Sequence, residues 1–231
     1  AKMKGLPKHE MVEGYHVYRV SSFRRSPYKA DLLAMAGFIA AGIPAGYQHI
    51  HDWKPDVIHV HFAVPSGPVA WFLSKITGTP YVLTAHLGDI PGGVPEKTNR
   101  WFRWVYPLTH RIWKDASRVV AVSEYSRELA LNHYPVEIEV IPNGVNLQAL
   151  DPGEIIPNQP PQILFAGRFM PQKNPVNLVR ILAELKDIPW ECTMLGDGQL
   201  KGDIEAEIRR CQLEARFSLP GWVKPEEVIQ N

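Results

Sequence analysis

Short apolar runs rich in β-branched residues alternate along this chain with longer segments of helical period, and this alternation constrains the fold most. It is typical of parallel sheets covered by helices, because each parallel connection must return the chain through a crossover. In the first half the predicted strands are residues 15–20, 56–62, 81–85, 118–122 and 138–141. The predicted helices are residues 30–53, 66–77, 98–115 and 124–133, the last with Ser123 as its N-cap.

A proline-rich segment interrupts the alternation. Residues 150–162 contain four prolines and no apolar periodicity, which is typical of an interdomain linker. The alternation then resumes, with predicted strands at 163–166, 190–195 and 217–219 and predicted helices at 175–186, at 203–213 and from Pro225 onward. We therefore predict an α/β fold in which two Rossmann-like parallel-sheet domains, residues 1–150 and 163–231, are joined by a linker at 151–162 and face a cleft.

Both predicted domains look incomplete. The chain opens without a strand that leads into a Gly-rich turn, and it stops inside a predicted helix. The three strands predicted for the second domain fall short of the about 5–6 strands of an ordinary sheet. We expect the first domain to lack its first strand and Gly-rich loop, and the second to be only partial.

Composition narrows the partners and the compartment. The 25 basic and 24 acidic side chains give a net charge of +1, so no basic excess points to nucleic acid as a partner. Two cysteines, Cys192 and Cys211, make a disulfide framework improbable and favour a reducing cytoplasm. No apolar run approaches the ~20 residues of a membrane-spanning helix.

Residues 99–114 leave a membrane-surface alternative open. Their apolar side chains follow one helical face: Trp101, Trp104, Leu108 and Ile112. Their basic side chains line the other: Arg100, Arg103, Arg111 and Lys114. Such a helix could lie peripherally on the inner membrane surface. We predict instead that its apolar face packs into the core of the first domain.

The strongest local motif is ILFAGRFMPQKN, residues 163–174. A predicted strand ends at Gly167, and Arg168 and Lys173 follow before the start of a helix. A guanidinium fork, a compact ammonium and the free N–H groups of a helix start together suit a diphosphate. The alternative is two solvated cations on a loop.

Two further strand ends could border a nucleoside. Gly196, Asp197 and Gly198 form a turn in which glycine permits close approach of the backbone to a ligand. The backbone of Trp222 and Val223 could meet a nucleobase after the next strand. Ordinary tight turns would explain both segments equally well.

Histidines gather at strand ends in the first domain. His59 and His61 lie on one face of a predicted strand, and His86 and Asp89 follow the next strand. Neighbouring parallel strands would bring these groups to one rim, where a histidine could bond a sugar hydroxyl or assist proton transfer. A metal site is the rival interpretation, and packing is the alternative for His59. We predict His86 as the functional residue.

Taken in order, six blocks resemble the group 1 glycosyltransferases. The blocks are PDVIHVH, HLGDIPG, DASRVVAVSEYSRELA, IEVIPNGVN, ILFAGRFMPQKN and LGDGQL, within residues 55–222. The resemblance implies a GT-B fold and a metal-independent, retaining transfer of a sugar from a nucleotide-diphosphate sugar to an unidentified saccharide, lipid or metabolite. It implies no cofactor, because the donor is a co-substrate.

The resemblance also implies roles for particular residues. Arg168 and Lys173, with Gly167, would bind the donor diphosphate and stabilise it as it departs. His86 would contact the donor sugar or the acceptor and is the expected catalytic residue. The nucleoside would border Gly196, Asp197, Gly198, Trp222 and Val223. We place Asp89 and His61 on the acceptor side.

The sequence departs from the family pattern in several places. Leu87 stands where many members carry glycine, and Asn174 replaces the glycine usual after the motif lysine. The N-terminal Gly-rich loop and the C-terminal paired-glutamate motif are missing, so we expect the 231 residues alone to have little or no transferase activity. Two other functions remain open: a metal-dependent hydrolase using His59, His61, His86 and Asp89, and a non-catalytic nucleotide-binding module.

Overall fold

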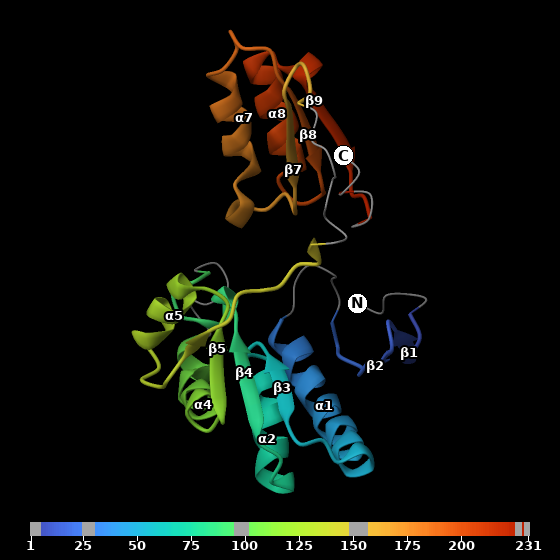
Figure 1. Cartoon of the computed structure of the whole chain (residues 1–231), viewed down its shortest axis with the longest axis vertical. Coiled ribbons are helices and arrows are strands. Elements are labelled where there is room, and N and C mark those ends of the chain that lie inside the picture. The colour runs from blue at the N-terminus through green and yellow to red at the C-terminus, as the bar shows by residue number, and fades with distance from the viewer. Residues whose placement is uncertain (1–5, 25–30, 95–101, 148–156, 225–227, 229–231) are drawn as a thin grey trace. The chain divides into compact units, whose positions relative to one another are not determined.

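The structure, a computed structural model, describes residues 6–24, 31–94, 102–147, 157–224 and 228 (Figure 1). The chain divides into two units, residues 1–144 and 145–231, each with its own parallel sheet. The predicted linker, residues 151–162, lies partly outside the described residues, so its role as a linker stays a prediction.

Unit 1 contains a four-stranded parallel sheet in the order β3-β4-β5-β6. These strands lie within the predicted ranges: β3 (Ile58–His61), β4 (Tyr81–Ala85), β5 (Arg118–Ala121) and β6 (Glu139–Val140). One face of the sheet is buried with side chains from three helices: α2 (Ser66–Thr77), α4 (Phe102–Lys114) and α5 (Glu124–Leu131). The Ser123 hydroxyl accepts the Ser126 N–H at 3.2 Å, which confirms the predicted N-cap of α5.

A hairpin precedes this sheet and was not predicted. Residues 15–18 form a strand, β2 (Tyr15–Tyr18), but it pairs antiparallel with β1 (His9–Val12) in a separate two-stranded sheet. The turn between them, Glu13 and Gly14, has positive φ at both residues, 48° and 87°. That backbone matches the right-handed twist of the two strands, so a two-residue turn suffices.

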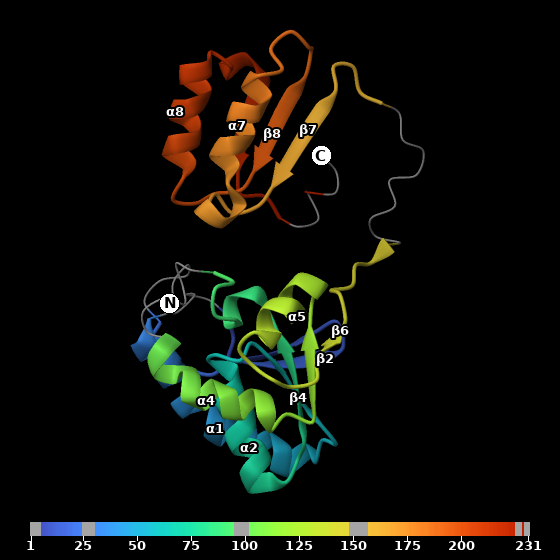
Figure 2. The same cartoon turned by 90° about the vertical axis from the view of Figure 1, so that its left-hand side faces the viewer.

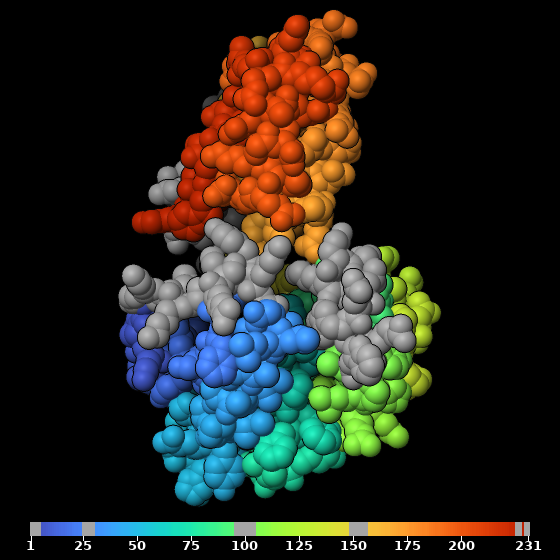
Figure 3. Space-filling view, turned by 180° about the vertical axis from the view of Figure 1, so that it is seen from behind, coloured from blue at the N-terminus to red at the C-terminus, as the bar shows by residue number. Residues whose placement is uncertain are grey.

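Helix α1 (Leu32–Trp53) packs against α2 through small residues. It begins where the Asp31 carboxylate accepts the Ala34 N–H at 2.7 Å. A Cβ added at Gly46 would lie 2.5 Å from a methyl of Leu73 on α2. This close approach leaves α1 and α2 side by side on the surface (Figure 3, blue and teal). No helix formed by the described residues is long and apolar enough to cross a membrane.

Helix α4 joins the core of unit 1, and Ile112 is buried as predicted, but the buried face is shifted away from Leu108. Ile112 and Trp113 are fully buried, whereas Leu108, predicted on the buried side, is 39% exposed. The buried face runs through Thr109, Ile112 and Trp113, and one residue of offset turns a side chain by about 100° around a helix. Trp101 and the side chain of Trp104 lie outside the described residues.

Unit 2 contains a three-stranded parallel sheet in the order β7-β8-β9. Its strands are β7 (Gln162–Ala166), β8 (Glu191–Leu195) and β9 (Phe217–Gly221). Helices α7 (Pro175–Ala183) and α8 (Lys201–Cys211) lie together on one face (Figure 2). Their buried side chains join the sheet in a second core, which includes Ile204, Ile208 and Cys211 as predicted. Cys192 and Cys211 are both buried and form no disulfide.

Candidate functional site

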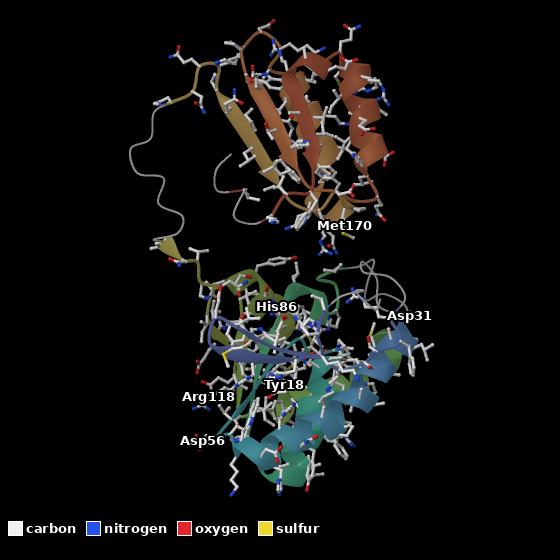
Figure 4. The ribbon with its side chains drawn as sticks, turned by 90° about the vertical axis from the view of Figure 1, so that its right-hand side faces the viewer. Tyr18, Asp31, Asp56, His86, Arg118 and Met170 are labelled. Atoms are coloured by element: carbon white, nitrogen blue, oxygen red, sulfur yellow. The ribbon has the colours of Figure 1, made fainter. Side chains whose placement is uncertain are left out.

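The carboxyl ends of β3 and β4 bring two histidines of unit 1 together. His61 closes β3, and His86 follows β4 directly. The Nδ1 atom of His61 lies 3.2 Å from the Nε2 atom of His86, within hydrogen-bond distance. Figure 4 shows His86 at the opposite end of the unit from Asp56 and Arg118, which lie where β3 and β5 begin. The expected rim therefore exists, formed by neighbouring parallel strands.

The hydrogen bond between these two rings constrains their protonation. One ring must supply the single proton and the other must accept it, so at least one imidazole is neutral. Partial burial lowers the pKa of His86 below its ordinary value, and the nearby His61 lowers it further. Because its Nε2 faces His61, a neutral His86 can offer a hydroxyl group only its Nδ1, as donor or as acceptor according to the tautomer.

His59 is exposed, but it is hydrogen-bonded to the neighbouring strand. Its Nε2 atom lies 2.8 Å from the hydroxyl of Thr84, a buried residue of β4. Burial lowers the pKa of His59, and the charge of His61 acts in the same direction. A neutral ring bonded to the neighbouring strand fixes the rim and has one nitrogen fewer to offer a ligand.

Asp89 does not stand on the rim surface. It is 2% exposed, and its carboxylate accepts the backbone N–H of His86 at 3.0 Å. It closes the turn Leu87–Asp89 that follows β4, and so it orients the His86 backbone. Among the described residues, no group of three or more His, Cys, Asp or Glu side chains is placed to hold a metal ion. The metal-site alternative therefore finds no ligand set in that part of the chain.

Phe62 is a rim residue to which the sequence analysis gave no role. Its ring stacks on the His86 imidazole with 4.4 Å between centroids and 26° between planes. The backbone of Phe62 has φ of +73°, and 45% of the residue is exposed. A positive φ at a phenylalanine that follows a strand results from contacts with other segments, so the letters IHVHF carry no signal for it.

The rim of unit 2 has a different construction, because a glycine ends or follows each strand. The Gly167 N–H donates to the Leu195 carbonyl at 2.9 Å, and the Gly196 N–H donates to the Gly221 carbonyl at 2.8 Å. A Cβ added at Gly196 would lie 1.9 Å from the Gly167 oxygen. Bare backbone therefore forms the surface where the three strands end.

The segment after β7 presents two cations beside this backbone. Arg168 and Lys173 are both exposed, and within the described residues neither side chain forms an ion pair or a side-chain hydrogen bond. Phe169, between them, is completely buried, and its N–H donates to the Asp197 carbonyl at 3.0 Å. The anchored phenylalanine turns its neighbours outward. Met170, the next residue, lies at the end of the unit where β7 terminates (Figure 4).

Asn174 occupies a left-handed position between this segment and α7, with φ and ψ both at 46°. This conformation explains why glycine is usual at this position in the family pattern. Asparagine is tolerated because it adopts the left-handed conformation more easily than most residues. No side chain caps the first turn of α7. Pro175 has no N–H and the Asn177 N–H donates to the Asn174 carbonyl at 3.1 Å, so among these first three residues the Val176 N–H is the donor left for an anion.

The other predicted nucleoside-side residues also lie on this rim. The Asp197 carboxylate accepts the Gly198 N–H at 2.8 Å, so it shapes the turn. A Cβ at Gly198 would lie 2.5 Å from the Phe169 oxygen, which restricts the position to glycine. Trp222 follows β9 and is 71% exposed, and Val223 is half-buried beside it. The helix predicted from Pro225 falls on residues that are mostly outside the description.

Comparison with known proteins matches each unit to a protein family. A family model described as Glycosyltransferase Family 4 matches residues 5–149, and one described as Glycosyl transferases group 1 matches residues 148–230. A similar curated relative is the 2-deoxystreptamine glucosyltransferase of Streptomyces kanamyceticus. It is 25% identical, and the match covers 97% of this chain and 64% of the relative. The chain spans about half the length of several curated relatives that it matches.

Solved structures show the same fold. The sucrose-phosphate synthase of Thermosynechococcus elongatus superposes with a TM-score of 0.71 and 18% identity, over 98% of this chain and 60% of that chain. Anabaena HepE, solved in complex with UDP-glucose, gives a TM-score of 0.60 and 19% identity, over 87% of this chain and 56% of its own. Sequence identities this low establish the fold, and they leave the substrates to be argued from the site.

Proposed function

The chain belongs to glycosyltransferase family 4, and from that premise we propose that the complete protein transfers a sugar from a nucleotide-diphosphate donor to an acceptor. We propose further that the anomeric configuration is retained and that no metal ion takes part. The observation that carries the proposal is the pair of cations on the glycine rim of unit 2, Arg168 and Lys173, whose side chains have no partner among the described residues.

The cation pair suits a diphosphate in charge and in shape. A diphosphate brings several anionic oxygens, of which a guanidinium can bind two at once while an ammonium binds another. The Val176 N–H in the first turn of α7 adds one backbone donor close in sequence to Lys173. As the bond to the sugar breaks, negative charge grows on the leaving oxygen, and these fixed positive groups stabilise it.

The histidine rim of unit 1 suits the uncharged partners of the reaction. A neutral His86 can hold a hydroxyl of the donor sugar or of the acceptor, and His61 fixes which of its ring nitrogens carries the proton. The backbone of Gly196, Gly198 and Val223 is the proposed border of the nucleoside. The donor base stays open, and so does the acceptor, among saccharides, lipids and small metabolites.

Calorimetric titration of the chain with UDP, GDP and ADP tests the diphosphate site. We expect one nucleotide to bind and the Arg168→Ala, Lys173→Ala double variant to lose at least about tenfold in affinity, because each charge-assisted bond contributes about 1.5–3 kcal/mol. A double variant at Lys186 and Arg209, two exposed cations elsewhere on unit 2, removes the same charge and should bind as the wild type does.

The two double variants separate a specific site from a general charge effect. Equal losses in both would mean that Arg168 and Lys173 act only through net charge, and unchanged binding in the first would contradict the site. Turnover needs the complete protein. Donor binding without any sugar transfer by that protein would favour a non-catalytic nucleotide-binding module instead.

A further inference from the structure

Phe62 directly follows β3 and has a backbone conformation that residues with a Cβ rarely adopt. Among the described residues, four other non-glycine positions have positive φ, and each has a local reason. Glu13 lies in the hairpin turn, Lys54 and Gln212 are helix C-caps, and Asn174 links a short turn to α7. Phe62 is the only aromatic residue in this set, and it caps no helix C-terminus.

The backbone of Phe62 is held from both sides. Its N–H donates to the Thr84 carbonyl on β4 at 3.2 Å, and its carbonyl accepts the Gly67 N–H at 3.1 Å. The next residue, Ala63, is completely buried. These contacts fix the left-handed conformation, and that conformation keeps a large apolar ring 45% exposed instead of in the core below it.

The exposed ring belongs to the histidine rim. One side of it stacks on His86, which is itself hydrogen-bonded to His61. The stack places an apolar surface directly beside a neutral hydrogen-bonding group. Strained backbone and an exposed aromatic ring at one position point to a ligand contact, because neither feature stabilises the fold.

We propose that Phe62 is a platform for a pyranose ring. A pyranose has an apolar face of C–H groups, which packs on an aromatic ring, and a rim of hydroxyls, which His86 would hydrogen-bond. The inference rests on the proposed glycosyltransferase function, and it names the residue of unit 1 that selects a sugar ring. A glycine in its place would keep the backbone and remove the platform.

Saturation-transfer NMR on the 231-residue chain tests this platform with methyl α-D-glucopyranoside, UDP and UDP-glucose as probes. We expect the wild type to transfer saturation to the C–H protons of the glycoside. Phe62→Gly should weaken glycoside binding by about two- to tenfold, whereas Phe62→Tyr should stay close to the wild type. Gln212→Gly replaces another left-handed residue, in unit 2, and should leave the glycoside signal unchanged.

Stability is the readout that separates a platform from a packing residue. Because glycine relaxes the left-handed backbone, Phe62→Gly should melt at the wild-type temperature or slightly above it. A clear fall in melting temperature with unchanged glycoside binding would overturn the proposal. The proposal would also be overturned if the wild type bound neither the free glycoside nor the glucose ring of UDP-glucose.

The probes also separate this inference from the proposed function. If Phe62→Gly loses the signal of the free glycoside, the platform binds an acceptor sugar. If it loses the signal of the glucose in UDP-glucose, the platform binds the donor sugar. Either result supports the proposal. The uridine signals of UDP report on the nucleotide site that we propose on unit 2. If they were absent while the glycoside signal depended on Phe62, the diphosphate site would fail and the platform would stand.

Discussion

The two units end their parallel strands with opposite kinds of residue. In unit 1 the rim consists of side chains that contact one another: His61, His86 and Phe62. In unit 2 it consists of glycine backbone and two cations without partners among the described residues. All nine histidines of the chain lie in residues 1–144, and residues 145–231 contain none. The same βα architecture thus carries a neutral, titratable rim in one unit and a permanently charged one in the other.

The difference assigns a different ligand chemistry to each rim. Fixed cations beside exposed backbone can neutralise a polyanion at any physiological pH. A neutral imidazole and an aromatic ring instead recognise hydroxyls and C–H surfaces, which carry no charge. The strain is also distributed differently, since unit 2 uses glycine where φ is positive after β8, whereas unit 1 uses Phe62.

The largest effect that we expect comes from filling the glycine surface of unit 2. Gly196→Ala would place a Cβ 1.9 Å from the Gly167 oxygen at a residue whose φ is +146°. Overpacking and backbone strain together should lower the free energy of unfolding by about 3 kcal/mol or more. Urea unfolding monitored by hydrogen exchange of β7 and β8 would measure it.

Gly202→Ala is the matched control, because a Cβ there meets no atom within 4 Å and the residue lies in the first turn of α8. It should be neutral or stabilise unit 2 by up to about 1 kcal/mol. If both alanine variants unfolded at the same urea concentration, the close approach of the β7 and β8 ends would be wrong. The contrast between backbone and side-chain rims would then fail.

Some of this contrast could be read from the sequence, and some could not. The β-branched runs predicted β3, β4 and β5, and the rule that neighbouring parallel strands end at one edge predicted that His61 and His86 meet. The order of Gly167, Arg168 and Lys173 predicted an exposed cation pair. In each case the pattern is local, so a short window of sequence contains the cause.

The features that escaped prediction depend on distant contacts. Phe62 takes its left-handed backbone from the Thr84 carbonyl and the Gly67 N–H, and neither partner can be recognised beforehand. Asp89 looked like a rim carboxylate, but the His86 N–H gives it a buried partner. The strand β1 was missed because HEMV is short and has a single β-branched residue, so pairing with β2 decides its conformation.

The pH dependence of stability should separate the two units. The folded-state pKa values of His59 and His86 lie below that of a free histidine, so the unfolded chain binds more protons. Unit 1 should therefore lose stability as the pH falls from 6.5 through these lowered values. Unit 2, without histidine, should be unchanged in that window. Hydrogen exchange with mass spectrometry, read unit by unit, measures both.

Unit 2 should respond only at lower pH. Hydrogen bonds from Arg210 and Arg180 lower the pKa of Glu207 from 4.5 to about 2. The contribution of Glu207 to the stability of unit 2 is therefore complete above pH 4.5 and is lost as the pH falls toward 2. Glu207→Gln should remove that acid transition and leave unit 1 unaffected. A loss of stability in unit 2 near pH 6 would contradict the assignment.

The smallest effect that we expect concerns Asn174, a residue with a side chain on the rim of unit 2. Asn174→Gly suits a residue at φ +46° and should change the free energy of unfolding by less than about 1 kcal/mol, because asparagine already tolerates the left-handed region. Asn174→Ala should lower it by about 1 kcal/mol. If unit 2 binds its ligand through backbone and cations, the affinity for UDP should change by less than about twofold in either Asn174 variant. Calorimetry on both variants measures this affinity. A marked loss of affinity in the glycine variant would show that the Asn174 amide contacts the nucleotide. The rim of unit 2 would then depend on a neutral side chain, as the rim of unit 1 does.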